Sequence, residues 1–218
     1  MNLAEQLAQG SSALDLALDE ATQRRLLAYV ELIHKWNQVH NLTAIRDREQ
    51  MVSHHLLDSL AVARHLASGT LADVGSGAGL PGIPLALADP QRPVALIESN
   101  QKKAAFLRQC KAELQLGNVE IVHERVEKMP PCAYDVVISR AFADLAEFVS
   151  LASGICKSGG SLAAMKGVYP HEELAQLPGD VALTRVIALE VPGVAAARHL
   201  VLLTRNAIDM ELPARGAD

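Results

Sequence analysis

Hydrophobic and polar residues alternate regularly between residues 70 and 166. Short apolar runs alternate with segments whose apolar residues recur at helical spacing. The runs predict five strands, at 71–74, 94–98, 119–123, 135–139 and 161–166. The segments between them predict three helices, near 83–88, over 100–115 and near 143–155. This alternation indicates an α/β fold with a doubly wound, mostly parallel sheet.

Two boundaries and a final strand pair complete the expected sheet. Ser99 is expected to cap the helix over 100–115, and residues 157–160, Lys-Ser-Gly-Gly, are expected to form a turn. Residues 183–191 and 199–205 predict two further strands, joined by a loop around Pro192. We expect this last pair to be antiparallel.

Residues 1–67 predict helices. Asp19 is placed to cap a helix whose apolar residues Leu26, Val30 and Ile33 share one face, and Asp47 is placed to cap a second amphipathic helix. The expected organisation has three parts: an N-terminal helical extension over 1–67 packed on the core, a main domain over 68–208, and a C-terminal tail over 209–218.

Composition narrows the class of protein. The 218 residues suffice for one α/β domain with a modest extension, and no apolar run approaches the roughly 20 residues that span a bilayer. The N-terminus lacks a secretion signal, so a cytoplasmic protein is expected. The three cysteines are widely spaced and suggest neither disulfides nor a zinc site. A net charge of −5 argues against nonspecific coating of nucleic acid, so a nucleic-acid substrate would need a local basic patch.

The segment after the first strand carries the strongest chemical signal. Gly75, Gly77 and Gly79 follow Asp73 and precede a helix, and such a loop lets the backbone approach a nucleotide-like cofactor. The dinucleotide pattern G-x-G-x-x-G is imperfect here, because Leu80 stands at its sixth position. The pattern D-x-G-x-G-x-G instead resembles motif I of class I S-adenosylmethionine methyltransferases, in which a terminal antiparallel strand pair is usual.

Two later strand ends supply candidate cofactor contacts. Glu98 closes the second strand, about 20 residues on, where an acid is expected to hold ribose hydroxyls. The alternative for the glycine loop is a purely structural turn between a strand and a helix. The position of Glu98 favours a cofactor site over that alternative. After the third strand, Glu127 or its backbone is a candidate for the adenine amino group, beside Val126. A solvated loop carboxylate is the alternative for Glu127.

The segment after the fourth strand bears on the reaction. Methyltransferases that act on exocyclic amines have Asn, Asp or Ser at this point, followed by Pro-Pro and an aromatic residue. Ser139 and Phe142 match the first and last positions, but Arg140 and Ala141 stand in place of Pro-Pro, which weakens the case for amine methylation. Pro131-Cys132 precedes the strand, so we do not expect it to supply a nucleophile for pyrimidine C5. Guanine N7 has an available lone pair, and transfer to it needs only alignment for in-line displacement.

Several side chains are candidates for the substrate side. Arg140 could hold a phosphate, the guanine O6 edge or the cofactor carboxylate, and Phe142 could stack on a base. A structural salt bridge and a core aromatic are the respective alternatives. Lys166 closes the fifth strand and Arg198 opens the last one, so both could reach RNA at the cleft edge. His54-His55 with Asp58 suggests packing and capping rather than a metal site, and we expect no metal.

Six segments together indicate a specific family. They are Trp36-Asn37 with 41–45, His55 with 58–60, 73–84, Lys102-Lys103 with Phe106-Leu107, 139–142 and Met165-Lys166-Gly167. This set resembles the ribosomal RNA small subunit methyltransferase G family, also called glucose-inhibited division protein B, over residues 30 to 205. The resemblance implies methylation of N7 of guanine 527 of 16S rRNA with S-adenosylmethionine. The expected partner is the 16S rRNA within the small ribosomal subunit, and the expected enzyme is a monomer without an assigned acid or base.

The resemblance also implies the residues of the two sites. Cofactor contacts carry over onto Gly75, Leu80, Val126, Glu127 and Arg140, with Glu98 in the ribose position. With the loop residues added, the expected cofactor site comprises Asp73, Gly75, Gly77, Gly79, Leu80, Glu98, Val126, Glu127 and Arg140. The expected RNA contacts are Phe142, Lys166 and Arg198.

Two other functions remain open at this point. One is a class I methyltransferase that acts on a small molecule or a protein, which would not show salt-sensitive binding to the ribosomal subunit. The other is a dinucleotide-binding regulator without catalysis, which predicts tight NADH binding and none of S-adenosylmethionine.

Overall fold

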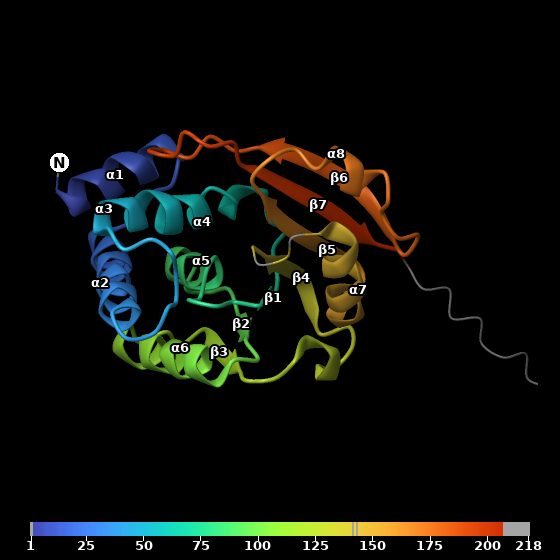
Figure 1. Cartoon of the computed structure of the whole chain (residues 1–218), viewed down its shortest axis with the longest axis horizontal. Coiled ribbons are helices and arrows are strands. Elements are labelled where there is room, and N and C mark those ends of the chain that lie inside the picture. The colour runs from blue at the N-terminus through green and yellow to red at the C-terminus, as the bar shows by residue number, and fades with distance from the viewer. Residues whose placement is uncertain (1, 141, 143, 207–218) are drawn as a thin grey trace, which may run out of the picture.

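The fold is known from a computed structural model, which describes residues 2–140, 142 and 144–206 (Figure 1). The expected C-terminal tail over 209–218 lies outside the described residues. Seven strands form one sheet in the order β3-β2-β1-β4-β5-β7-β6. The strands are β1 Leu71–Val74, β2 Val94–Ile97, β3 Val119–Val122, β4 Tyr134–Ser139, β5 Cys156–Lys166, β6 Val181–Ala188 and β7 His199–Arg205.

The sheet is mostly parallel, as the sequence predicted. Strands β1 to β5 are parallel to one another, whereas β7 is antiparallel to both of its neighbours, β5 and β6. The insertion of β7 between β5 and β6 distinguishes this sheet from the dinucleotide-binding order 3-2-1-4-5-6. The predicted antiparallel last strand is therefore confirmed.

The turn predicted at residues 157–160 is wrong. These residues belong to β5, which begins at Cys156 and bulges against β4: Tyr134 pairs with Cys156, but Val136 pairs with Ser161. Between these two pairs β5 has four residues and β4 has one, so three extra residues on β5 are accommodated within the ladder, and Gly159 takes a φ of +72° there. The Gly-Gly pair marks a bulge inside a strand rather than its start.

The helices between the strands are close to the predicted ones. They are α5 Gly82–Ala88, α6 Gln101–Glu113, α7 Leu145–Ala152 and α8 His171–Leu174, with the 3₁₀ turns η3 Val126–Lys128 and η4 Ser153–Ile155. The prediction that Ser99 caps the helix over 100–115 is wrong. Asn100 is the cap, because its side chain accepts from the backbone N–H groups of Lys102 and Lys103. Glu98 holds the N–H of Asn100 at 2.7 Å, which delays the helix by one residue.

The N-terminal residues form helices, as predicted. They are α1 Leu3–Ala13, α2 Glu20–Asn37, α3 Arg48–Met51, the π-helical turn η1 Val52–Leu57, α4 Asp58–Leu60 and the 3₁₀ turn η2 Ala63–His65. Asp19 and Asp47 cap α2 and α3, accepting from Thr22 at 2.7 Å and Gln50 at 2.8 Å. Both predicted caps are confirmed.

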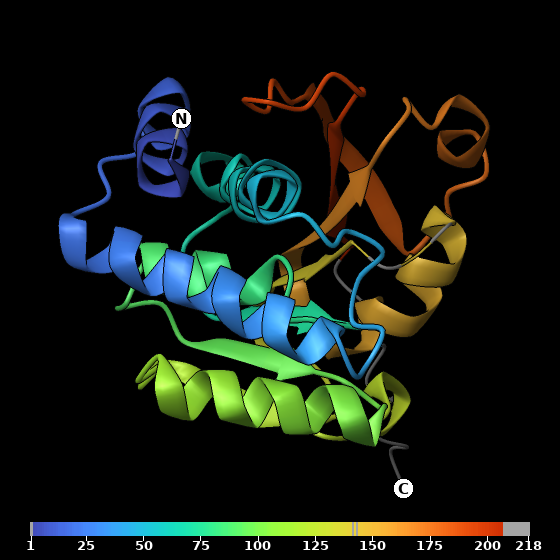
Figure 2. The same cartoon turned by 60° about the vertical axis from the view of Figure 1, so that its left-hand side comes forward.

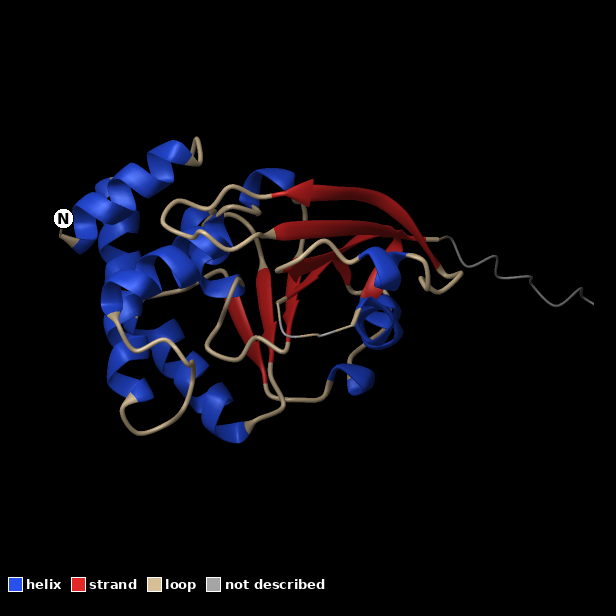
Figure 3. Ribbon diagram, turned by 45° about the horizontal axis from the view of Figure 1, so that its top comes forward, coloured by secondary structure: helices blue, strands red, loops and turns tan. Residues whose placement is uncertain are grey.

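The sheet lies between two layers of helices (Figures 2 and 3), and the residues on each side of it form their own apolar cluster. Leu71 and Val136 join a cluster with α1, α2, η1, α5 and α6, whereas their neighbours Ala72 and Val137 join a cluster with α7. This alternation follows from the period of two along a strand. The N-terminal helices share the larger cluster with β1 and α5, while β6 and β7 lie toward the opposite side of the molecule (Figure 1).

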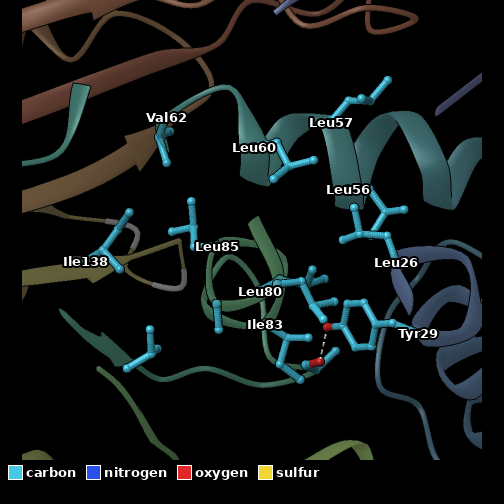
Figure 4. Packing of buried hydrophobic residues seen from close by; sticks show 14 of the residues in the cluster. Leu26, Tyr29, Leu56, Leu57, Leu60, Val62, Leu80, Ile83, Leu85 and Ile138 are labelled. Carbon is cyan, nitrogen blue, oxygen red and sulfur yellow. Dashed lines mark hydrogen bonds between the residues drawn. The ribbon is translucent and has the colours of Figure 1, made fainter. Parts of the chain in front are cut away.

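Helix α2 is joined to the main domain by polar as well as apolar contacts. The buried hydroxyl of Tyr29 donates to the carbonyl of Ala78 in the glycine-rich loop, beside Leu80 and Ile83 (Figure 4). Trp36 donates its indole N–H to Gln109 of α6 at 2.9 Å. Across the described ranges, no helix is both long and apolar enough to cross a membrane.

Candidate functional site

The loop after β1 has the backbone conformation that only glycine adopts readily. Gly75, Gly77 and Gly79 have φ values of +69°, +59° and +87°. A Cβ built on Gly77 would find Gly75 O as its nearest protein atom, 3.8 Å away. The backbone at Gly77 therefore borders open space, so a ligand can approach it closely.

Asp73 anchors the far end of the same loop. Its Oδ2 accepts from the backbone N–H of Gly82 at 2.9 Å, whereas its buried Oδ1 has no hydrogen-bond partner among the described residues. Burial raises the pKa of Asp73 to about 7, against the lowering effect of the Gly82 hydrogen bond. A Cβ on Gly82 would lie 2.2 Å from Leu96 Cδ2 and 2.8 Å from Asp73 Oδ2. Gly82 is thus needed for close approach, a role that the sequence analysis missed although its motif included the residue.

Glu98 ties the loop to the next helix. One carboxylate oxygen accepts from the N–H of Gly77 at 2.8 Å, and the other accepts from the N–H of Asn100 at 2.7 Å. The side chain is buried, and it lies at the end of β2 as expected. Each carboxylate oxygen has further lone pairs, so these bonds leave acceptor capacity for a ligand. The ribose contact itself stays a prediction.

A cavity of about 250 Å³ lies next to this loop. Gly75, Ile97, Val126 and Phe142 contribute to it, together with the exposed Glu127. Its lining therefore combines aliphatic, aromatic and carboxylate groups, which suits a purine with a polar edge. Phe142 was expected on the RNA side, but it contributes to this cavity and packs on Phe148 with ring centroids 5.6 Å apart.

These features fit the cofactor that the family resemblance implies. The glycine loop offers close approach to backbone, and the cavity offers apolar walls for an adenine. Asp73 Oδ1 is a buried acceptor that lacks a donor among the described residues, and the ammonium of an amino-acid group is a donor of the matching kind. Of the predicted cofactor residues, Gly75, Val126 and Glu127 line this cavity, whereas Arg140 lines a second one.

The second cavity has a volume of about 380 Å³ and collects the predicted cations. Arg140, Lys166 and Arg198 all line it, although they come from three separate strand ends. The other lining residues are Thr43, Ala44, Ile45, His54, His55, Asp58, Met165, Gly167, Leu189 and His199. Two predicted RNA contacts and Arg140 thus share one site.

Asp58 joins two of these cations. Its carboxylate pairs with Arg140 at 3.2 Å and with Arg198 at 2.9 Å, and its side chain is only 4% exposed. The sequence analysis expected packing and capping from this segment and did not find the bridge. The signal that was available is an acid at the end of an apolar helical face, which is unfavourable when buried unless it is paired. No group of three or more potential metal ligands occurs within 2–140, 142 and 144–206.

Lys166 is largely buried, whereas the sequence analysis expected it at the edge of the cleft. Its side chain is 8% exposed, and its ammonium lies 2.7 Å from Glu173. Glu173 also accepts from the backbone N–H of Leu145, so the pair connects β5 to α7 and α8. An RNA contact by Lys166 stays a prediction.

His55 is a neutral group in the wall of the second cavity. Burial, together with the nearby charge of Arg140, lowers its pKa to about 4. Its Nε2 lies 3.0 Å from the hydroxyl of Thr43. Thr43 is itself held by Asn37, whose side chain accepts from Leu42 and Thr43 and donates to the carbonyl of Ile45. Asn37 thus shapes a loop that the sequence analysis noted only as a motif.

Comparison with known proteins identifies the family. A family model described as rRNA small subunit methyltransferase G matches residues 22–201. The protein of Nitrosospira multiformis named ribosomal RNA small subunit methyltransferase G is 55% identical, covering 94% of this chain and 99% of the relative. The protein of the same name from Aromatoleum aromaticum is 54% identical, covering 92% and 98%.

Solved structures agree on the fold at much lower identity. The mitomycin 7-O-methyltransferase MmcR has a TM-score of 0.60 at 16% identity and covers 81% of this chain and 60% of its own. A SAM-dependent methyltransferase from Aquifex aeolicus has a TM-score of 0.55 at 19% identity, covering 73% and 94%. The predicted class I methyltransferase fold and the family resemblance are therefore confirmed. The chain belongs to the rRNA small subunit methyltransferase G family, a family of S-adenosylmethionine-dependent rRNA methyltransferases.

Proposed function

We propose that this protein transfers the methyl group of S-adenosylmethionine to N7 of a single guanine, position 527 of 16S rRNA. The observation that carries the proposal is the junction after β4. Arg140 lines the cavity that collects the cations, and Phe142, two residues on, contributes to the cavity beside the glycine loop. One short segment therefore separates a site suited to the cofactor from a site suited to a nucleotide.

The chain's own residues have distinct tasks in this reaction. S-adenosylmethionine, when bound, supplies an electrophilic methyl group. The loop from Gly75 to Leu80, with Glu98, Val126 and Glu127, would hold the cofactor. Arg140 and Arg198 would orient the target nucleotide in the second cavity. Guanine N7 carries a lone pair, so the protein need not remove a proton and contributes alignment of the reacting groups.

A direct test is transfer of labelled methyl from S-adenosylmethionine to small ribosomal subunits that lack this modification. We expect label at one guanine N7, identified by mapping the nucleotide, and none on subunits that already carry the methyl group. Naked rRNA in parallel distinguishes recognition of free RNA from recognition of the assembled subunit. No label on either substrate, with cofactor binding intact, would overturn the proposed substrate.

A small molecule or a protein is the second candidate substrate. The Arg140–Arg198 cavity favours an anionic partner, which RNA is, and the relatives are named as rRNA methyltransferases. Binding to the subunit that weakens steeply with salt would support RNA.

A further inference from the structure

We propose that Asp58 is a positioning residue for the target nucleotide. Its carboxylate holds Arg140 and Arg198 together, so that their remaining N–H groups bind acceptor oxygens of that nucleotide. This inference rests on the proposed function, because it assigns the residue that builds the substrate side of the same site. Asp58 itself touches neither cofactor nor substrate in this scheme.

The bridge joins three parts of the chain that are far apart in sequence. Asp58 follows the π-helical turn η1, Arg140 follows β4, and Arg198 precedes β7. The two pairs span 82 and 140 residues. Oδ2 accepts from Arg140 Nη1 at 3.2 Å and Oδ1 from Arg198 Nε at 2.9 Å, so each oxygen fixes one guanidinium.

Each guanidinium is held at a second point as well. Arg140 Nη1 also donates to the carbonyl of His54 at 3.2 Å, and Arg198 Nη1 donates to the carbonyl of Ala197 at 2.9 Å. Within the described part of the chain, Arg140 donates hydrogen bonds only from Nη1, and Arg198 only from Nε and Nη1, so the Nη2 group of each is unused. Both residues line the cavity. Arginine presents five donors in a rigid fork, so two fixed points determine where the unused donors lie.

Stability alone is a weak reason for such a bridge. Removing a carboxylate and two guanidinium groups from water costs about as much as their attraction returns, and apolar replacements are often as stable. Two cations around one anion also leave a net positive charge in the cavity, which suits a polyanionic substrate. The charge of Arg140 extends toward the cofactor side too, where it acts to lower the pKa of Asp73. Arg140 is therefore placed between the two sites, and Asp58 determines its position.

Asp58→Asn is the main test, because asparagine keeps the size of the side chain but removes its charge. We expect kcat/KM for unmethylated subunits to fall about 30-fold, with the cofactor Kd changed less than about 3-fold. Asp135→Asn is the matched control: Asp135 pairs with Lys157 at 2.8 Å near the start of β4, whereas Arg140 follows the other end of that strand. We expect this variant to leave kcat and KM unchanged.

A double-mutant cycle separates positioning from a merely structural role. If Asp58 acts through the arginines, Asp58→Asn should lose much less activity in an Arg198→Ala background than in the wild type. Effects that multiply, or an Asp58→Asn variant that loses thermal stability while its folded fraction keeps wild-type kcat and KM, would overturn the proposal. Should Asp58→Asn fail to fold, Asp58→Glu keeps the charge, and the proposal then requires a folded variant whose KM for subunits is raised.

Salt dependence identifies which acceptor oxygens are bound. If the arginines bind a phosphate, Asp58→Asn should reduce the slope of log KM against log salt by about one. An unchanged slope, with the same loss of activity, assigns them to a base oxygen such as guanine O6. Failure of the wild-type protein to label any guanine would refute the proposed function, whereas failure of this inference appears only in the ratio of variant to wild type.

Discussion

The two cavities at the carboxyl ends of the parallel strands are built in different ways. Beside the glycine loop, Asp73 and Glu98 bind backbone N–H groups of Gly77, Gly82 and Asn100, all within 30 residues of chain. In the second cavity, side chain binds side chain across 82 and 140 residues. The first site is thus a property of one local motif, and the second is a property of the whole fold.

This difference predicts how each site responds to change. A site made from backbone groups depends on the few carboxylates that hold its loop. A site made from a charge network depends on charged side chains that come from several separate elements. Substitutions should therefore divide into those that change cofactor affinity and those that change use of the RNA. The experiments on Glu98, Arg140 and helix α2 test that division, and an experiment on His55 tests burial in the wall of the second cavity.

Glu98→Ala should have the largest effect on the cofactor side. The carboxylate makes two hydrogen bonds to backbone N–H groups, each worth about 2 kcal/mol, so the loop loses about 4 kcal/mol of support. We expect the affinity for S-adenosylmethionine to fall about 1,000-fold, as measured by calorimetry. Glu127→Ala, which removes an exposed carboxylate from the same cavity, should have a much smaller effect. Equal losses in the two variants would contradict the role of Glu98 in holding the loop.

Burial of His55 in the wall of the second cavity should make the stability of the protein depend on pH. The unfolded chain protonates this histidine below about pH 6.5, whereas the folded protein does so only below about pH 4. The free energy of unfolding should therefore fall as the pH drops from 6.5 to 4, by about 3 kcal/mol, and be unaffected by this group above 6.5.

The measurement is urea unfolding of wild type and His55→Gln at several pH values. The variant should lose less stability on acidification than the wild type, and the difference isolates His55 from the titrating carboxylates. His123→Gln, at an exposed histidine after β3, is the control and should follow the wild type. If the free energy of unfolding changes with pH in the same way for wild type and His55→Gln, burial of His55 does not destabilise the protein at low pH.

The same contrast explains what the sequence could and could not predict. The positions of the strands, the glycine loop and the place of Glu98 follow from local patterns, since spacing along one chain segment determines them. The Asp58 bridge does not, because nothing in 54–58 indicates which cations will reach it from 140 and 198. Lys166 was predicted at the cleft edge for its position, but its enclosure by Glu173 depends on how α8 folds back.

Arg140→Ala should reduce methyl transfer more than it alters folding. Asp58 would keep Arg198 as a partner, so the buried carboxylate is not left alone. We expect turnover on subunits to fall about 100-fold at saturating cofactor, which corresponds to about 2.7 kcal/mol. Single-turnover transfer together with thermal unfolding measures both quantities. Unchanged turnover at saturating cofactor would remove Arg140 from the site.

Helix α2 supports both sites, and it allows the finest separation between them. Tyr29 donates to Ala78 O in the glycine loop, whereas Asn37 holds residues 42–45 beside the second cavity. Tyr29→Phe should lower the free energy of unfolding by about 1 kcal/mol, because the buried carbonyl of Ala78 loses its donor. It should also weaken cofactor binding a few-fold and leave KM for subunits unchanged. Asn37→Ala should do the reverse, raising KM for subunits while cofactor affinity stays near that of the wild type. If both variants change both constants equally, the two sites are coupled through α2, and the division between a local site and a fold-dependent site does not hold.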